Sequence, residues 1–193
     1  MKTTPSSSVL AGLAGLLALA CGTTSDAGPG ASPAAAQAPE ALEPAICGAL
    51  EKVHELGGVY TAGQPTAEDL AAAREAGIRT VIDLRKPGED RGYDEAAAAE
   101  ALGLDYVTLP WNGPAELTDE VFERGRELLR TAERPLLFHC ASANRCGALW
   151  IPYRVLDEGV PLDVAVAEAK TIGLKTPEYE SKARAYVARE RRP

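Results

Sequence analysis

The sequence has few of the histidines and cysteines that usually bind zinc. Its 193 residues include two His and four Cys, and no two cysteines are spaced Cys-x-x-Cys, which leaves little for a zinc site. Basic residues are also in deficit, since 28 Asp and Glu against 20 Lys and Arg give a net charge of −8. A general nucleic-acid-binding protein usually has a basic patch and a pI above about 9, so we expect no nucleic-acid partner. No apolar run reaches the roughly 20 residues that span a bilayer.

The N-terminus has the pattern of an export signal. Lys2 supplies a short positive region, and residues 9–20 form an apolar stretch that is too short for a membrane span. The letters LALACG at 17–22 resemble the lipobox of bacterial lipoproteins, in which the cysteine is lipidated and becomes the new N-terminus. We therefore predict lipidation of Cys21 and a membrane partner reached through that anchor in the bacterial cell envelope. Gly22 is typical of outer-membrane lipoproteins that face the periplasm, and an ordinary secretory signal is the alternative.

Composition divides the chain into three parts. The predicted signal peptide covers 1–20, and residues 21–44 are rich in Gly, Ser, Thr, Pro and Ala with almost no large apolar side chain. Such a stretch cannot bury enough surface to offset its ordering entropy, so we interpret it as a flexible tether. Residues 45–193 are long enough for one sizeable core and form the predicted domain.

Within this domain, strand-like and helix-like segments alternate. The segment 78–84, IRTVIDL, is β-branched and apolar, as a buried parallel strand should be. The residues at 66–69 have the pattern of a capping box, and Gly77 is typical of a helix end. The alternation predicts an α/β fold with a mainly parallel sheet that helices cover on both faces. Further strands are expected at 59–61, 104–109 and 135–139, and helices at 66–76, 94–102, 118–132, 146–158, 161–172 and 177–189.

The segment 136–150 has the pattern of a catalytic loop. An apolar strand ends at Cys140, four small or polar residues follow, and Arg145 precedes a helix. The N–H groups of a tight loop that opens a helix point inward and hold an oxyanion. The helix dipole and Arg145 favour a negative charge on Cys140, so we expect a lowered thiol pKa and a nucleophilic thiolate. The alternative is a buried cysteine at a strand end, with Arg145 in a surface ion pair.

Around these residues the chain resembles the protein tyrosine phosphatase-like superfamily. It resembles more closely a bacterial family of phosphatase-like domains known from beta-lactamase-hydrolase-like proteins. Five segments carry the resemblance in the order of that family, and together they cover about residues 56–190. These segments are GQPTAEDL at 63–70, GIRTVIDLR at 77–85, LGLDYVTLP at 102–110, HCASANRCGALW at 139–150 and EAKTIGL at 168–174.

The resemblance implies a three-layer α/β/α fold with a four- to five-stranded, mainly parallel sheet. It implies that Cys140 is the nucleophile, that Arg145 clamps the phosphate, and that His139 tunes the thiolate. The reaction would pass through a phosphocysteine intermediate and would need neither a metal nor an organic cofactor. The backbone N–H groups of the oxyanion cradle would be those of Ala141, Ser142, Ala143, Asn144 and Arg145.

Three features depart from the phosphatase pattern. Four residues separate Cys140 from Arg145, one fewer than in the phosphatase signature, and rhodanese-type sulfurtransferases use a short loop of similar size. Cys146 stands where phosphatases carry Ser or Thr, and a thiol is a weak hydrogen-bond donor. Asn112 stands in the loop where phosphatases carry an aspartic general acid. The acids that could replace it are Glu116, Asp119 and Asp83.

The remaining cysteines and the tryptophans have structural interpretations. We interpret Cys146 as a small residue packed under the helix, with a disulfide to Cys47 or oxidation against Cys140 as alternatives in an exported protein. Trp150 is expected in the core. Trp111 fits the core and a substrate pocket equally well.

Three functions remain open at this point. The first is an exported Cys-dependent hydrolase of a phosphate monoester, whose partner is a phosphorylated small molecule or a phosphoprotein. The second is a rhodanese-type sulfurtransferase that carries a persulfide on Cys140, which the short loop favours. The third is a non-catalytic module that binds an oxyanion, which the missing acid favours.

Overall fold

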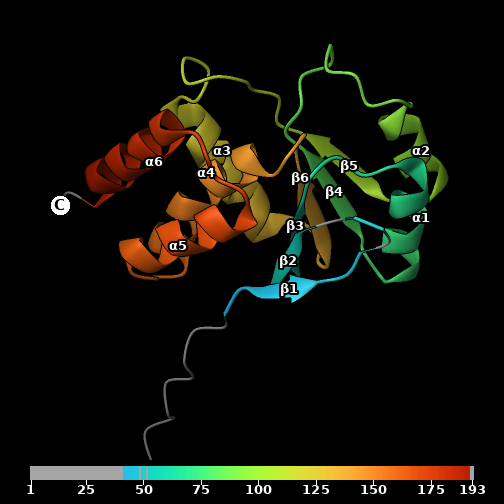
Figure 1. Ribbon diagram of the computed structural model, residues 1–193, viewed down its shortest axis with the longest axis horizontal. Coiled ribbons are helices and arrows are strands. Elements are labelled where there is room, and N and C mark those ends of the chain that lie inside the picture. Colours follow the sequence, from blue (N-terminus) through green and yellow to red (C-terminus); the bar gives the residue numbers. More distant parts are fainter. Residues whose placement is uncertain (1–40, 48, 51, 192–193) are drawn as a thin grey trace, which may run out of the picture. The chain divides into compact units, whose positions relative to one another are not determined.

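The computed structural model describes residues 41–191 apart from residues 48 and 51 (Figure 1). The predicted signal peptide, Cys21 and most of the predicted tether lie outside the described residues. Within this described part, no helix is long and apolar enough to cross a membrane.

Six strands of the described residues form one sheet. In chain order they are β1 (Glu43–Ala45), β2 (Val53–Leu56), β3 (Val59–Ala62), β4 (Thr80–Asp83), β5 (Asp105–Thr108) and β6 (Leu136–His139). Their order across the sheet is β1-β2-β3-β6-β4-β5. The last four of that order run parallel, whereas β1 and β2 pair antiparallel at one edge.

The prediction of a mainly parallel α/β fold is confirmed, and the sheet has six strands rather than four or five. The additional strands are β1 and β2, and β1 includes the last two residues, Glu43 and Pro44, of the predicted tether. Their sequences, Glu-Pro-Ala and Val-His-Glu-Leu, lack the apolar run of a central strand. They form by backbone pairing at a sheet edge, here with Ala45 opposite Val53, and composition does not reveal such pairing.

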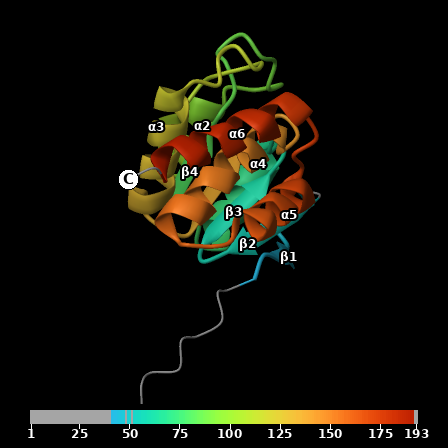
Figure 2. The same ribbon diagram turned by 90° about the vertical axis from the view of Figure 1, so that its left-hand side faces the viewer.

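Helices cover both faces of the sheet, which gives the expected three layers (Figures 1 and 2). One face carries α1 (Ala67–Glu75) and α2 (Glu95–Ala101). The other carries α3 (Asp119–Thr131), α4 (Asn144–Pro152), α5 (Leu162–Ile172) and α6 (Pro177–Glu190). The segment 146–158, predicted as one helix, forms most of α4 and then a π-helical turn over Tyr153–Asp157.

Side-chain caps define where the first helices begin. Thr66 and Asp69 form the expected capping box of α1, since the Asp69 N–H donates to Thr66 Oγ1 at 3.1 Å and the Thr66 N–H donates to Asp69 Oδ2 at 3.0 Å. Asp94 caps α2 by accepting from the Ala97 N–H at 3.0 Å. A cap of this kind contributes about 1 kcal/mol to stability.

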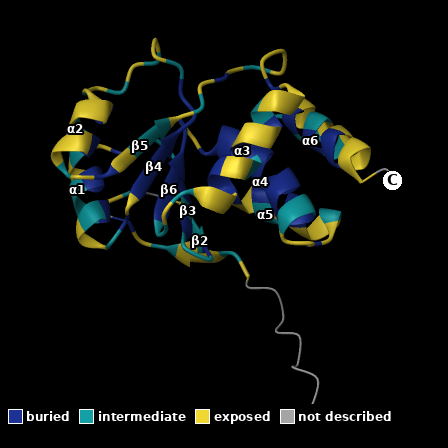
Figure 3. Cartoon of the chain, turned by 180° about the vertical axis from the view of Figure 1, so that it is seen from behind, coloured by how far each residue is buried: buried dark blue, intermediate teal, exposed yellow. Residues whose placement is uncertain are grey.

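Strand β6 turns its side chains alternately towards two cores. Leu136 and Phe138 pack in the core under α3 and α4, and Leu137 packs in the core under α1. Helix α4 is buried from Arg145 to Pro152 (Figure 3). Because a fully buried Leu or Phe side chain contributes about 1.5–3 kcal/mol, β6 and α4 firmly anchor the loop that joins them.

Candidate active site

The loop between β6 and α4 lies at the carboxyl ends of the parallel strands, where α/β sheets usually bind ligands. We name residues Cys140–Arg145 the cradle loop. It is attached to the chain that follows β3. The Gln64 N–H donates to the Ala141 carbonyl oxygen at 3.4 Å, and Gly63 pairs with Ser142 in an isolated bridge.

Ala143 makes the turn from the cradle loop into α4. It is the N-cap residue of the helix and has a left-handed backbone, with φ 59° and ψ 0°. This conformation costs a residue with a Cβ roughly 1–2 kcal/mol. Such strain persists only where the surrounding structure enforces it, and it gathers at functional sites. The turn starts α4 at Asn144, so Arg145 lies in the first helical turn.

Cys140 lies buried at the base of the cradle loop. Its thiolate accepts hydrogen bonds from the Cys146 thiol and from the backbone N–H groups of Ser142 and Arg145, and the Arg145 guanidinium adds a positive charge. These contributions outweigh the cost of burial and hold the pKa of Cys140 well below its usual value. The thiolate is the nucleophilic form of cysteine, as the sequence pattern predicts.

Cys146 is fully buried, as the packing interpretation predicts, and it also contacts Cys140. Its Sγ lies 3.5 Å from the Phe138 carbonyl oxygen and 3.9 Å from that of Ala62. Burial, the hydrogen bond to Cys140 and the charge on Cys140 raise the pKa of Cys146 well above its usual value, so this thiol stays protonated. Within the described residues Cys47, Cys140 and Cys146 are free thiols, so neither alternative disulfide is formed there.

Arg145 is only 5% exposed, and its guanidinium is held by a carboxylate. Nη1 donates to Glu89 Oε1 at 2.6 Å, and Nη2 donates to Glu89 Oε2 at 2.7 Å. Nη1 also donates to the carbonyl oxygens of Trp111 at 2.9 Å and Leu84 at 3.2 Å. The hydrogen bond from Arg145 lowers the pKa of Glu89 to about 2. The alternative that places Arg145 in a surface ion pair is therefore wrong.

Sequence reasoning missed Glu89. It lies just after the turn Lys86-Pro87-Gly88, which predicts only the end of a strand. Its place follows from the order of the strands, because β4 pairs with β6 and the chain after β4 passes the cradle loop. A buried arginine needs a carboxylate partner, and this turn brings one beside it.

Two loops flank Arg145 and are joined to each other by an ion pair. Lys86 Nζ, after β4, lies 2.7 Å from Glu116 Oε1, after β5. Glu116 Oε2 accepts a hydrogen bond from the Asn112 N–H at 2.8 Å. The hydrogen bonds from Lys86 and from Asn112 lower the pKa of Glu116. The loop after β5 thus contacts Arg145 through the Trp111 carbonyl oxygen, and the same loop contains Glu116.

The two tryptophans are both buried. Trp111 packs edge-on against Tyr179, with 5.0 Å between ring centroids, so its ring belongs to the core and not to an open pocket. Trp150 lies in the core, as expected, and its Nε1 donates to Glu168 Oε2 at 2.8 Å.

The structure separates the three candidate acids. Asp83 is fully buried and lies on the face of the sheet that α1 and α2 cover, whereas Cys140 lies on the other face. Asp119 begins α3 and forms an ion pair on the surface with Arg189. Glu116 is the one of the three that lies in a loop contacting Arg145.

His139 faces the opposite side of β6 from Cys140. Its buried Nε2 lies 2.8 Å from Glu95 Oε1 and 3.9 Å from Asp83 Oδ1, and the ligand atoms of these three residues lie within 4.8 Å of one another. The positive charge beside these two carboxylates comes from the Arg91 guanidinium. Arg91 Nη2 lies 2.6 Å from Asp83 Oδ2, and Arg91 Nε lies 3.5 Å from Glu95 Oε2. We therefore interpret it as an ion network beneath the strand end. Tuning of the thiolate by His139 stays a prediction.

The side chains between Cys140 and Arg145 differ in their surroundings. Ala141 and Ser142 are exposed, whereas Ala143 is buried. The Asn144 side chain connects the cradle loop to the chain after α5, because its Oδ1 accepts a hydrogen bond from the Lys175 N–H at 2.8 Å. Its backbone is thus the part that is left for the predicted oxyanion cradle.

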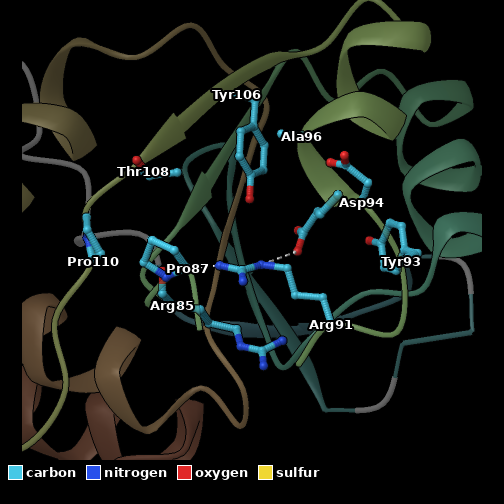
Figure 4. Close-up of a pocket in the computed structure, with 10 residues that line it drawn as sticks. Arg85, Pro87, Arg91, Tyr93, Asp94, Ala96, Tyr106, Thr108 and Pro110 are labelled. Carbon is cyan, nitrogen blue, oxygen red and sulfur yellow. Dashed lines mark hydrogen bonds and ion pairs between the residues drawn. The ribbon is translucent and has the colours of Figure 1, made fainter. Parts of the chain in front are cut away.

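A cavity of about 370 Å³ opens between α2, β5 and the chain after β4 (Figure 4). Two arginines reach it, but Arg91 is paired with Asp83 and Glu95, and Arg85 donates to Gln64. None of its described lining residues belongs to the cradle loop. This cavity is therefore separate from the loop at the end of β6.

The same strands, cradle loop and helices occur in known proteins. The family model "Beta-lactamase hydrolase-like protein, phosphatase-like domain" matches residues 57–155, about half of the chain. This chain belongs to that family. The Beta-lactamase hydrolase-like proteins of Agrobacterium fabrum and Xylella fastidiosa are 31% and 32% identical over 100 and 99 residues, or 50% and 49% of this chain. This phosphatase-like chain matches only 23% of the length of each of those relatives.

Solved structures share the fold of this phosphatase-like domain. A protein from Shewanella putrefaciens, named as an assumed phosphatase, has a TM-score of 0.63 at 18% identity, covering 73% of this chain and 94% of that one. The TpbA protein of P. aeruginosa, in complex with pTyr, has a TM-score of 0.56 at 24% identity, covering 79% and 90%. The chain therefore has the same phosphatase-like α/β fold as these proteins, as the sequence resemblance predicts.

Proposed function

We propose that this phosphatase-like domain hydrolyses phosphate monoesters through Cys140. The observation that carries the proposal is the buried Cys140, whose pKa is held well below its usual value, at the start of the loop that ends in Arg145, whose guanidinium Glu89 holds in place. The N–H groups at the start of α4 and the planar fork of Arg145 suit a phosphate dianion. A protein of the same fold binds pTyr, which supports a phosphorylated small molecule or phosphoprotein as the substrate.

The proposed reaction has two steps. The Cys140 thiolate attacks phosphorus, so an S–P bond forms while the ester P–O bond breaks and its electron pair leaves with the alcohol oxygen. That oxygen takes a proton from a general acid. Water then attacks the phosphocysteine, the S–P bond breaks, and inorganic phosphate leaves the regenerated thiolate. Cys146 stabilises the thiolate at both ends of the cycle through its S–H donor.

Glu116 is the general acid in this proposal. It lies in the loop after β5, which contacts Arg145 through the Trp111 carbonyl. The ion pair with Lys86 lowers its pKa, so only a small fraction of Glu116 is protonated at neutral pH. We therefore expect slow turnover of poor leaving groups, because proton transfer contributes about 10²–10⁴ to rate.

Hydrolysis of a small aryl phosphate tests the proposal. The purified protein is compared with Cys140→Ser and with Cys47→Ala, which removes a buried thiol that lies outside the cradle loop. We expect turnover to fall at least about a thousandfold in Cys140→Ser and to persist in Cys47→Ala. Undiminished turnover in Cys140→Ser would overturn the proposal.

The length of the cradle loop supports a second candidate, sulfur transfer. There the Cys140 thiolate attacks the outer sulfur of thiosulfate, the S–S bond breaks, and sulfite leaves with its electron pair. A mass gain of one sulfur atom on Cys140, without ester hydrolysis, would favour this reaction. Phosphate binding with neither turnover nor persulfide would favour a non-catalytic oxyanion-binding module.

We also propose that the protein is exported and lipid-anchored in the cell envelope. The support is the sequence of residues 1–20 and the lipobox at Cys21, which lie outside the described residues. Fatty-acid labelling in a bacterial host tests this, with Cys21→Ser as the variant that loses the label. Equal labelling of the variant would contradict the anchor.

A further inference from the structure

A hollow of about 440 Å³ adjoins the cradle loop. Ser142 and Ala143 of that loop line it on one side, and the end of α5 with the residues that follow lines it on another. Small-molecule pockets measure about 300–1,000 Å³, so this hollow can accept one substituent of a small substrate.

Three lysines line this hollow, which we name the lysine pocket. Lys52 precedes β2, Lys170 lies in α5, and Lys175 lies between α5 and α6. The whole sequence has six lysines and a net charge of −8, so half of its lysines meet at one place. None of the described lining residues is acidic. The pocket therefore has the opposite charge to the chain as a whole, and it attracts an anion.

The topology brings these lysines to the cradle loop. Because β2 runs antiparallel to β3, the start of β2 lies at the sheet edge where β3 and β6 end. The Oδ1 atom of Asn144, in the cradle loop, accepts a hydrogen bond from the backbone N–H of Lys175 at 2.8 Å. Gly173 lies against the loop, since a Cβ added there would stand 3.0 Å from the Ser142 carbonyl oxygen. The lysine pocket and the cradle loop thus share a wall.

The ammonium groups keep donors for a ligand. Lys170 Nζ lies 3.1 Å from Glu180 Oε2, and this ion pair uses one of three N–H donors. Glu180 is shared with Arg184, whose Nη2 lies 2.8 Å from Glu180 Oε1, so it neutralises Lys170 only in part. Lys52 and Lys175 are exposed, and both line the pocket.

We propose that the lysine pocket binds a second phosphate group of the substrate while the first lies in the cradle loop. The substrate class is then a small molecule with two or more phosphate groups. This inference rests on the proposed phosphatase function. It follows from the shared wall and from the three lysines, since ammonium groups bind phosphate as point charges.

Matched esters test the proposal. Alkanediol bisphosphates of increasing chain length are compared with the alkyl monophosphates of the same length, and the measured quantity is the ratio of their kcat/KM values. We expect the ratio at the best length to exceed about ten, which corresponds to about 1.4 kcal/mol. The double variant Lys170→Ala, Lys175→Ala should bring the ratio close to one. The control is Lys182→Ala, which removes a lysine that is not among the described residues of the pocket, and it should keep the ratio.

Binding separates this proposal from the phosphatase proposal. Calorimetry with Cys140→Ser measures the affinity for the same two ester series without turnover. If neither series is hydrolysed by the wild-type protein but bisphosphates bind at least about tenfold more tightly, the phosphatase proposal fails and the lysine pocket stands. If bisphosphates and monophosphates bind equally at every length, or if the double variant keeps the preference, the lysine pocket is overturned.

Discussion

The two oxygens of Glu89 lie 2.6 Å and 2.7 Å from the terminal nitrogens of Arg145, and this carboxylate orients the guanidinium together with the carbonyl oxygens of Trp111 and Leu84. A guanidinium has five N–H donors in a planar fork, and in the proposed function the donors that these contacts leave unused bind the phosphate. In that proposal the Glu89–Arg145 pair positions these donors before a substrate arrives, which lowers the entropy that binding must overcome.

Glu89→Gln keeps the shape of this partner and removes its charge. We expect kcat/KM for a phosphate ester to fall about ten- to a hundredfold, because Arg145 loses its orientation. The control is Glu127→Gln, which removes a carboxylate from an exposed ion pair with Arg124. Exposed pairs contribute at most about 1 kcal/mol, so the control should keep both stability and activity.

The same variant has a pH signature in stability. Arg145 lowers the pKa of Glu89 from 4.5 to about 2, so the pair stabilises the fold above pH 4.5 and this contribution is lost as the pH falls through 2. The difference in unfolding free energy between wild type and Glu89→Gln should therefore be constant near neutral pH and shrink in acid. Denaturant unfolding at several pH values measures it. A difference that does not change with pH would refute this role of the charge.

Cys146→Ala removes the S–H donor that faces Cys140. The pKa of Cys140 should rise, because the thiolate loses its largest stabilising contact. The pH at which the rate of Cys140 alkylation by iodoacetamide rises should therefore be higher in Cys146→Ala than in the wild type. Cys146→Ser, which restores a donor, should shift that pH back towards the wild-type value. Identical profiles for all three proteins would show that Cys146 only fills space.

Gly173→Ala tests the wall between the cradle loop and the lysine pocket. Gly173 has φ 142°, and an added Cβ would stand 3.0 Å from the Ser142 carbonyl oxygen. Gly159→Ala is the matched control, since Gly159 has φ 71° and no described atom within 4 Å of an added Cβ. We expect the control to lose about 1–2 kcal/mol from backbone strain, and Gly173→Ala to lose more and to bind phosphate more weakly. Equal losses with unchanged phosphate binding would rule out the close contact.

Lys86→Met tests the proposed acid. The ion pair with Lys86 lowers the pKa of Glu116, so removing the lysine raises that pKa. A general acid works in its protonated form, below its pKa. The basic limb of the kcat profile should therefore move to higher pH, for an alkyl phosphate more than for an aryl phosphate with a good leaving group. An unmoved basic limb in both substrates would exclude Glu116 as the acid.

Much of the candidate site could be predicted because its parts are adjacent in the chain. An apolar strand, Cys140, four small residues, Arg145 and a helix follow one another, and short-range backbone geometry then places the N–H groups around the thiolate. The alternation of apolar strands with amphipathic helices similarly predicted the layers. The edge strands β1 and β2 escaped prediction because backbone pairing, and not an apolar pattern, holds them.

By itself, then, the sequence determined the α/β layers, the family and the strand-loop-helix unit with Cys140 and Arg145. Only the tertiary structure decided which groups face that unit. Glu89 lies 56 residues before Arg145, and Asp83 lies on the far face of the sheet although it precedes Glu89 closely in the chain. The physical reason is that such contacts depend on which strand neighbours which and on which face each side chain takes. Burial over the whole sheet sets both, and no local pattern encodes them.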